Sequence, residues 1–205
     1  GGVRQLKLPG VEPRGALASH DPATGVITLR LSTQMPGGAR NTLAKDILDM
    51  APEKIRVVVG DVGGGFGMKT GLYPEDAVVA WAARHTGRPV RWSGERGEEF
   101  LSTTHGRDVR AHAELALAAD GRILARRVQS HANVGAYALP TGVAIQLMIG
   151  PWVQTSVYDI PVIDFHFRAV LTHQAPTGAY RGAGRPEATF VVERLVEVAA
   201  RQLGQ

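Results

Sequence analysis

The sequence predicts an α/β protein in which mixed sheets pack against helices. The apolar, β-branched run 55–59 is followed by a glycine-rich stretch and then by a helix-like run that starts near Tyr73. A second glycine-containing stretch, 179–186, also has a strand-like run before it and a helix-like run after it. The run 186–203 carries apolar residues at helical spacing. Strands and helices that alternate in this way are typical of sheets covered by helices.

The composition indicates a globular protein and excludes several function classes. The chain has 205 residues, of which 44% are hydrophobic and 20% charged, enough for one large or two small domains with a buried core. The formal net charge of +4 is modest and the basic residues are scattered, so we expect no nucleic-acid partner. No apolar stretch approaches the roughly 20 residues of a membrane helix. The absence of cysteine excludes disulfides, zinc–thiolate sites and protein-ligated iron–sulfur clusters from these residues.

The first part of the chain predicts an irregular lead-in followed by regular elements. Residues 1–23 are expected to be irregular because three prolines interrupt them, and the domain proper is expected over 24–205. The β-branched run 25–32 predicts a strand, and the apolar spacing over 39–50 predicts a helix. The run 55–59 is the next expected strand.

The middle of the chain predicts a helix between two short elements. A helix should open at Pro74, which suits the first helical position, and end at Gly87. A short strand over 89–92 and a short helix over 95–101 should follow. The tryptophans are all expected in the core: Trp81, Trp92 and Trp152.

The last part of the chain predicts a long hairpin and a terminal helix. The strand-like runs 107–118 and 123–134 flank an Asp-Gly turn signal. The stretch 135–158 is interpreted as a loop, with at most one helical turn, because glycines and prolines recur in it. The alternation over 162–172 predicts a strand, and 186–203 is the clearest helix. The acids on that helix are expected to be solvated or capping residues: Glu187, Glu193 and Glu197.

Two loops form the candidate binding site. In the stretch 63–67 almost no side chains stand between backbone N–H groups and a bound group. By itself this stretch could equally be a structural turn, and it lacks the spacing of a phosphate loop or of a dinucleotide fingerprint. The stretch 180–187 holds two arginines and could be a surface turn, while Gln34 adds a side-chain amide at a strand end. We interpret the loops as closing on one large anionic cofactor beside the strand ends.

With these segments the sequence resembles the molybdopterin-binding large subunits of the xanthine dehydrogenase/aldehyde oxidase family, in the part of the family close to carbon monoxide dehydrogenase. The resemblance covers nearly the whole chain and implies the first molybdopterin-binding domain, with the second absent from these residues. Four segments carry it: Ser32-Thr33-Gln34, Gly63-Gly64-Gly65-Phe66-Gly67, Thr86-Gly87-Arg88-Pro89-Val90 and Ala179-Tyr180-Arg181-Gly182-Ala183-Gly184-Arg185-Pro186-Glu187.

The resemblance implies cofactor-binding roles for matching residues. The Gln34 amide would reach an oxygen ligand of molybdenum, Phe66 and Gly67 would lie beside the metal, and the Arg181 main chain would approach from the other side. The metal would be held through the pterin, so no metal ligand is expected here. The general base would lie beyond Gln205, so no catalytic residue is assigned. The implied cofactor-binding residues are Gln34, Gly65, Phe66, Gly67, Arg181, Gly182 and Ala183.

Three departures from the family pattern bear on the reaction. Gly182 stands where carbon monoxide dehydrogenases of the family hold copper with a cysteine, so a copper–molybdenum site is not expected. Purine hydroxylases have a glutamate at the position of Thr70 and a phenylalanine at that of Ala183, so purine specificity is not expected either. We expect a molybdenum-dependent oxidoreductase that hydroxylates an aldehyde or another small carbon substrate with oxygen from water.

The resemblance also implies cofactors and partners. The cofactor would be molybdenum–molybdopterin in its cytosine dinucleotide form, with electrons passing to an iron–sulfur small subunit and an FAD-binding medium subunit in the cytoplasm. Because the chain starts at Gly1 rather than Met, we expect a fragment of a longer protein that is inactive alone. The alternative is a truncated or degenerate binding or assembly protein that keeps the fold without the chemistry.

Overall fold

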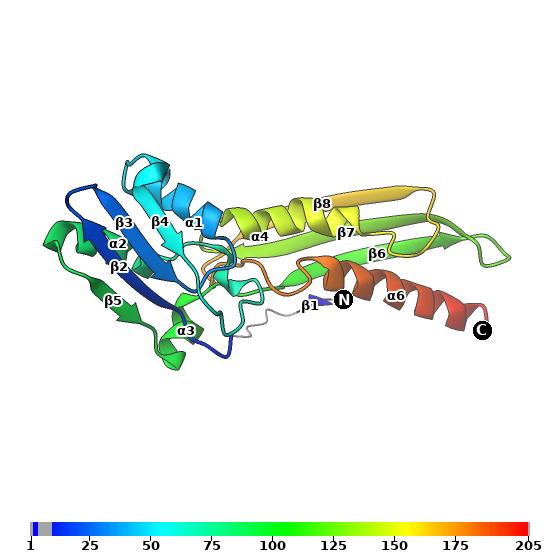
Figure 1. The fold of residues 1–205 in the computed structure, drawn as a ribbon. Helices are drawn as coiled ribbons and strands as arrows, with labels where there is room; N and C mark the ends of the chain where they lie inside the picture. Colours follow the sequence, from blue (N-terminus) through cyan, green and yellow to red (C-terminus); the bar gives the residue numbers. More distant parts are fainter. Residues whose placement is uncertain (1, 4–9, 205) are drawn as a thin grey trace. The chain divides into compact units, whose positions relative to one another are not determined.

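The structure, a computed structural model, describes residues 2–3 and 10–204 (Figure 1). The chain divides into two compact units, with Gly1–Lys7 and Thr104–Gln205 in unit 1 and Leu8–Thr103 in unit 2. The described residues form two four-stranded sheets with packed helices, which confirms the predicted fold class. Among these residues no helix has both the length and the apolar character that a membrane crossing requires.

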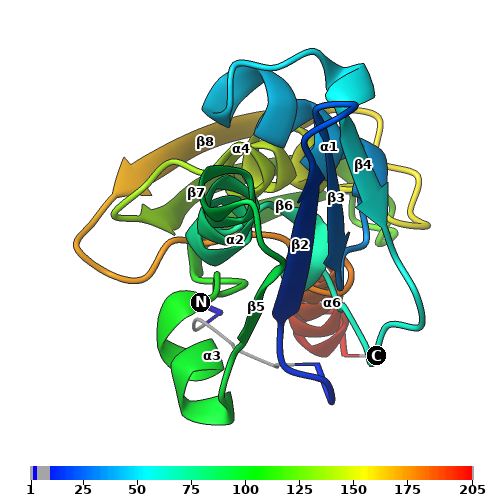
Figure 2. The same cartoon turned by 60° about the vertical axis from the view of Figure 1, so that its left-hand side comes forward.

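Unit 2 is built on a sheet with the strand order β4-β3-β2-β5, which Figure 2 shows from right to left. Strand β2 pairs antiparallel with β3 and β5, whereas β3 and β4 are parallel. The elements of unit 2 in chain order are β2 (Gly15–Asp21), β3 (Val26–Leu31), α1 (Pro36–Thr42), the π-helical turn η1 (Leu43–Ile47), the 3-10 turn η2 (Pro52–Lys54), β4 (Ile55–Val58), the 3-10 turn η3 (Met68–Thr70), α2 (Pro74–Thr86), β5 (Val90–Ser93) and α3 (Arg96–Ser102).

The core of unit 2 lies on one face of this sheet, under α2 and η1. Small residues of β2, such as Ala18, leave room for the helix, while Ile27 and Leu29 of β3 are fully buried. On the other side of the contact Leu43 of η1 and Ala80 of α2 are also fully buried. Gly87 ends α2 with φ of 64°, the left-handed conformation that glycine adopts at little cost, as the sequence predicts.

Three expectations for unit 2 are wrong. The lead-in is not irregular throughout, because Gly15–Asp21 forms β2 between the prolines rather than across them; Pro9 lies outside the described residues. Helix α1 begins at Pro36 rather than at residue 39, since proline is well suited to a first helical turn. Trp81 is 54% exposed on α2 and not in the core. The predicted domain 24–205 covers parts of both units, and its status as one domain stays a prediction.

Unit 1 is built on a sheet with the order β1-β6-β7-β8, in which β6 and β7 form the predicted hairpin. Val128 and Ala132 of β7 are buried, while Gln129 and His131, which lie between them in the sequence, are exposed. The elements of unit 1 in chain order are β1 (Gly2–Val3), β6 (Val109–Leu117), β7 (Ile123–Gly135), α4 (Pro140–Ala144), the π-helical turn η4 (Ile145–Ile149), α5 (Gly150–Trp152), β8 (Ile163–Leu171) and α6 (Arg185–Gln202).

The stretch 135–158 is helical rather than a loop, and this corrects the sequence interpretation. Strand β8 pairs parallel with β7, and two consecutive parallel strands need a crossover, which is usually helical. Helices α4 and α5, joined by η4, provide it (Figure 1). The π-helical turn directly precedes Gly150 and Pro151, and proline has no N–H for a regular helical ladder. Trp152, expected in the core, is 73% exposed.

Candidate functional site

The glycine loop, residues 62–68, connects β4 to η3 in unit 2 and holds the side chain of Gln34. The backbone N–H of Gly67 donates a hydrogen bond to Gln34 Oε1 at 2.8 Å. An N–H donor requires the amide oxygen as its partner, so this bond fixes which end of the Gln34 amide faces the loop. Gln34 is exposed, and its NH2 group therefore presents two donors on the side away from Gly67.

The glycines of this loop are required for two different reasons. A Cβ on Gly65 would lie 2.3 Å from Gln34 Oε1, so any side chain there would force the Gln34 side chain out of its place. Gly64 and Gly67 instead have φ of 92° and 98°, which non-glycine residues rarely adopt. Phe66 is also left-handed, with φ of 50°. The space that the sequence interpretation assigned to a bound group is, at Gly65, taken by Gln34.

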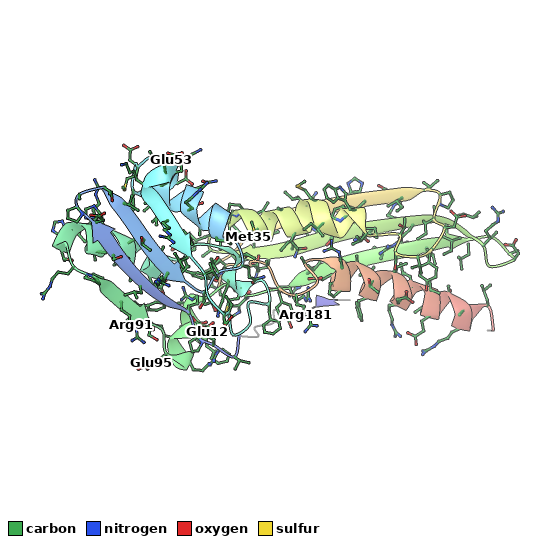
Figure 3. The ribbon with its side chains drawn as sticks, in the orientation of Figure 1. Glu12, Met35, Glu53, Arg91, Glu95 and Arg181 are labelled. Carbon is green, nitrogen blue, oxygen red and sulfur yellow. The ribbon has the colours of Figure 1, made fainter. Side chains whose placement is uncertain are left out.

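Glu12 (labelled in Figure 3) was not predicted from the sequence as a site residue. It connects the glycine loop to Ser32, the residue that follows strand β3. Its Oε2 accepts hydrogen bonds from the Gly63 backbone N–H at 2.8 Å and from Lys69 Nζ at 2.9 Å. Its Oε1 accepts one from Ser32 Oγ at 3.0 Å. Partial burial alone would raise the pKa of the Glu12 carboxyl, but together the bonds from Lys69, Gly63 and Ser32 leave it below its usual value.

Lys69 links Glu12 to the backbone of Gln34. The Lys69 side chain is 0% exposed and pairs with Glu12, while its backbone carbonyl accepts from the Gln34 N–H at 2.8 Å. The Thr33 hydroxyl donates to the same carbonyl at 3.1 Å. Gln34 is thus held at its backbone by Lys69 and at its side chain by Gly67.

A second buried polar cluster in unit 2 centres on Arg14. Its guanidinium donates to Glu99 Oε1 at 2.8 Å and to both carboxylate oxygens of Glu75 at 3.2 Å. The neighbouring Asp76 accepts from the Tyr73 backbone N–H at 3.0 Å at the start of α2. Burial raises the pKa of Asp76 from its ordinary 3.8 to about 6, although the Tyr73 hydrogen bond and the charge of Arg14 oppose the shift.

The raised pKa of Asp76 predicts a pH dependence of the stability of unit 2. A carboxyl whose pKa is higher in the folded state binds its proton more tightly there, so its contribution to stability is complete below about 3.8 and is lost as the pH rises through about 6. Asp76→Asn, which cannot ionise, should remove this decline. The measurement is the melting temperature of wild type and variant across pH 4 to 7, where equal slopes would contradict the assignment.

The arginine loop, residues 180–184, lies in unit 1 immediately before α6 (Arg181 is labelled in Figure 3). Three consecutive residues in it are left-handed: Gly182 with φ of 94°, Ala183 with 45° and Gly184 with 85°. The Ala183 N–H donates to the Tyr180 carbonyl at 2.7 Å, which closes the turn. Arg181 and Gly182 are exposed on it. The turn therefore brings its three predicted site residues together at the positive end of a helix dipole.

Arg107 links the arginine loop to the first turn of α6 through hydrogen bonds. Its Nη2 donates to the Arg181 carbonyl at 2.7 Å, and its Nη1 donates to both oxygens of Glu187 at 3.2 and 3.0 Å. The guanidinium also lies over the Tyr180 ring, 4.6 Å from its centroid. Glu187 is 8% exposed, so the expectation that it is solvated is wrong: it is the buried partner of Arg107.

The structure thus groups the predicted site residues into two sets. Gln34, Gly65 and Gly67 contact one another in unit 2, with Phe66 between the last two. Arg181, Gly182 and Ala183 form one turn in unit 1. In the part of the chain that the structure describes, no cluster of three or more histidines, aspartates or glutamates is arranged to hold a metal ion.

Sequence reasoning missed the residues that support the two loops, namely Glu12, Lys69 and Arg107. Each acts across a long sequence separation, 57 residues from Glu12 to Lys69 and 80 from Arg107 to Glu187.

Comparison with known proteins identifies the family of the chain. The molybdopterin cofactor-binding domain family matches residues 5–205. The chain is 38% identical over 199 residues to the carbon monoxide dehydrogenase large chain of Hydrogenophaga pseudoflava, covering 94% of this chain and 24% of that one. It is 35% identical over 199 residues to the 6-hydroxypseudooxynicotine dehydrogenase complex subunit gamma of Paenarthrobacter nicotinovorans, covering 95% and 24%.

Solved structures show the same fold. Quinoline 2-oxidoreductase from Pseudomonas putida 86 superposes with a TM-score of 0.92 at 39% identity, over 98% of this chain and 25% of that one. Aldehyde oxidoreductase from Desulfovibrio gigas gives 0.90 at 25% identity, over 98% and 22%. The chain spans about a quarter of the length of these relatives. The resemblance predicted from the sequence is confirmed, and the chain belongs to the molybdopterin cofactor-binding domain family.

Proposed function

We propose that this chain is the first molybdopterin-binding domain of a molybdenum hydroxylase large subunit, and that its glycine loop and its arginine loop each take part in binding the cofactor. The observation that carries the proposal is the hydrogen bond from Gly67 to Gln34, which leaves the NH2 group of the amide on the side away from Gly67. An exposed amide held in one orientation is suited to donate to an oxygen ligand of a metal centre.

Both the glycine loop with Gln34 and the arginine loop have features that suit an anionic group. In unit 2 Gly67 carries no Cβ, so a bound group could approach its backbone closely, whereas the space beside Gly64 is taken by the Phe66 ring. In unit 1 the exposed arginine loop opens an 18-residue helix, whose first N–H groups and dipole favour negative charge. Fixed donors of this kind stabilise charge without having to reorient when the charge develops.

The cofactor, when bound, would supply the transfer of oxygen from water and the acceptance of two electrons. The residues of this chain would bind and orient it. Gln34 would donate from its NH2 group, the Gly67 N–H would keep that amide in place, and the Arg181 main chain would contribute from the second loop.

The finer parts of the proposal rest on the resemblance and on the names of the relatives. The cofactor would be the cytosine dinucleotide form, and the electrons would leave through an iron–sulfur subunit and an FAD-binding subunit in the cytoplasm. Two relatives are named as a large chain and as a subunit of a complex, which supports partner subunits.

Two substrate classes are supported for the complete protein. An aldehyde or another small carbon substrate is the first, because Gly182, Thr70 and Ala183 depart from the copper-binding and purine patterns. An N-heteroaromatic ring is the second, because relatives are named quinoline 2-oxidoreductase and nicotine 6-hydroxylase large subunit. Dye reduction by the purified complex with an aromatic aldehyde or with quinoline would separate the two.

The complete large subunit, produced with its partners in a host that makes the cofactor, should contain one molybdenum and one pterin per large subunit. Elemental analysis and pterin fluorescence after oxidation measure both. Residues 1–205 alone serve as a control that should load poorly and show no aldehyde-dependent dye reduction, because a half-site cannot exclude water and its donors lose strength in solvent. Absence of molybdenum from the complete protein would favour the alternative, a degenerate protein that only binds or assembles.

A further inference from the structure

We propose that Glu12 is a positioning residue that sets the direction of the Gln34 amide through the glycine loop and Lys69. This inference rests on the proposed function, because it assigns Glu12 a part in orienting the group that would meet the cofactor. Glu12 itself would not touch the reacting atoms.

Glu12 forms hydrogen bonds at both ends of the glycine loop. Its carboxylate accepts from Gly63 at the start of the loop and from Lys69 just after it. The Glu12 backbone N–H also donates to the Gly63 carbonyl at 3.0 Å. A Cβ on Gly63 would lie 2.4 Å from Glu12 Cβ, so the two backbones are already in contact. Any displacement of Glu12 is therefore transmitted to the loop.

The buried charge of Lys69 depends on Glu12. Its side chain is 0% exposed, and Glu12 is its salt-bridge partner. A buried ammonium without a counter-charge is strongly unfavourable, so loss of the Glu12 charge would drive Lys69 toward solvent. The Lys69 carbonyl would move with it, and this carbonyl holds the Gln34 N–H and the Thr33 hydroxyl.

For the position of the loop, the charge of the Glu12 side chain matters more than its size. The carboxylate accepts three donors on two oxygens, from Ser32, Gly63 and Lys69. A glutamine of the same shape has only one acceptor oxygen and no charge to balance Lys69. Glu12→Gln should therefore disturb the loop while removing almost no volume.

A double-mutant cycle in the complete, molybdenum-loaded complex tests the proposal with Glu12→Gln, Gln34→Ala and the double variant. Residues that support a metal site from outside its ligands typically change activity about 10- to 100-fold, and we expect this loss of kcat for Glu12→Gln. If Glu12 acts through Gln34, adding Glu12→Gln to Gln34→Ala should change kcat by less than about twofold. The paramagnetic resonance spectrum of the partly reduced metal should shift in Glu12→Gln as it does in Gln34→Ala.

Glu75→Gln is the matched control, because Glu75 is also a partly buried, ion-paired carboxylate of unit 2 but bonds to Arg14 rather than to the loop. It should leave both kcat and the spectrum unchanged. Equal losses of kcat from Glu12→Gln in both backgrounds, or a wild-type spectrum in Glu12→Gln, would overturn the proposal. If Glu12→Gln does not fold, Glu12→Asp, which keeps the charge but shortens the reach, enters the same cycle. A wild-type complex without molybdenum overturns the proposed function as well, whereas a loaded complex indifferent to Glu12 overturns only this inference.

Discussion

Gly65→Val should abolish cofactor loading of the complete large subunit while leaving unit 2 folded. Any Cβ at this position would lie 2.3 Å from Gln34 Oε1 and 2.5 Å from Gln34 Cδ, a distance that real Cβ atoms do not tolerate. The valine would push the Gln34 side chain and the loop backbone apart, which distorts the loop itself and is a larger change than loss of the Gln34 amide alone. Backbone conformation is not the cause, because Gly65, unlike Gly64 and Gly67, has no positive φ.

The measurement is the molybdenum content of purified wild type and variant, together with their melting temperatures. Gly71→Val is the matched control, because Gly71 has an extended backbone with φ of −98° and ψ of 165° and nothing lies within 4 Å of its would-be Cβ. We expect background molybdenum for Gly65→Val and normal content for Gly71→Val. Normal loading of both would show that the contact between Gly65 and Gln34 is irrelevant to the cofactor.

Arg107→Met should be the most destabilising single change at the arginine loop. It keeps the length of the side chain but leaves the Glu187 carboxylate buried without its partner, and it removes the donor to the Arg181 carbonyl. Breaking a buried ion pair from one side costs about 3–5 kcal/mol, because the remaining charge stays desolvated. The loop and the first turn of α6 should therefore open far more often than in wild type.

Hydrogen–deuterium exchange of peptides covering residues 180–190 in the complete large subunit measures this opening. Arg127→Met is the control, since Arg127 pairs with Asp164 on the exposed face of the sheet and should matter little. Arg107→Met combined with Glu187→Leu should recover much of the lost protection, because no charge is then left buried and unpaired. Unchanged protection in Arg107→Met alone would refute a structural role for the pair.

The sequence by itself determined most of the elements, because their signals are local. Alternation and helical spacing predicted β3, β8, α2 and α6, and an Asp-Gly turn predicted the β6–β7 hairpin. The glycine-rich segments predicted the two loops and, through the family resemblance, Gln34 and Arg181. Gln34 and the glycine loop do meet, as the hydrogen bond from Gly67 shows.

Only the tertiary structure decided which residues hold those loops in place. Glu12 and Arg107 act across 51 and 74 residues on the glycine and arginine loops, and no local pattern encodes pairing at such separations. The helical crossover 140–152 was hidden by its glycines and prolines, yet the parallel pairing of β7 and β8 requires it. The sequence shows that residue 65 is a glycine. Only the folded structure shows why a side chain would be disfavoured there, because the Gln34 side chain packs against it and this steric requirement exists only once the chain has folded.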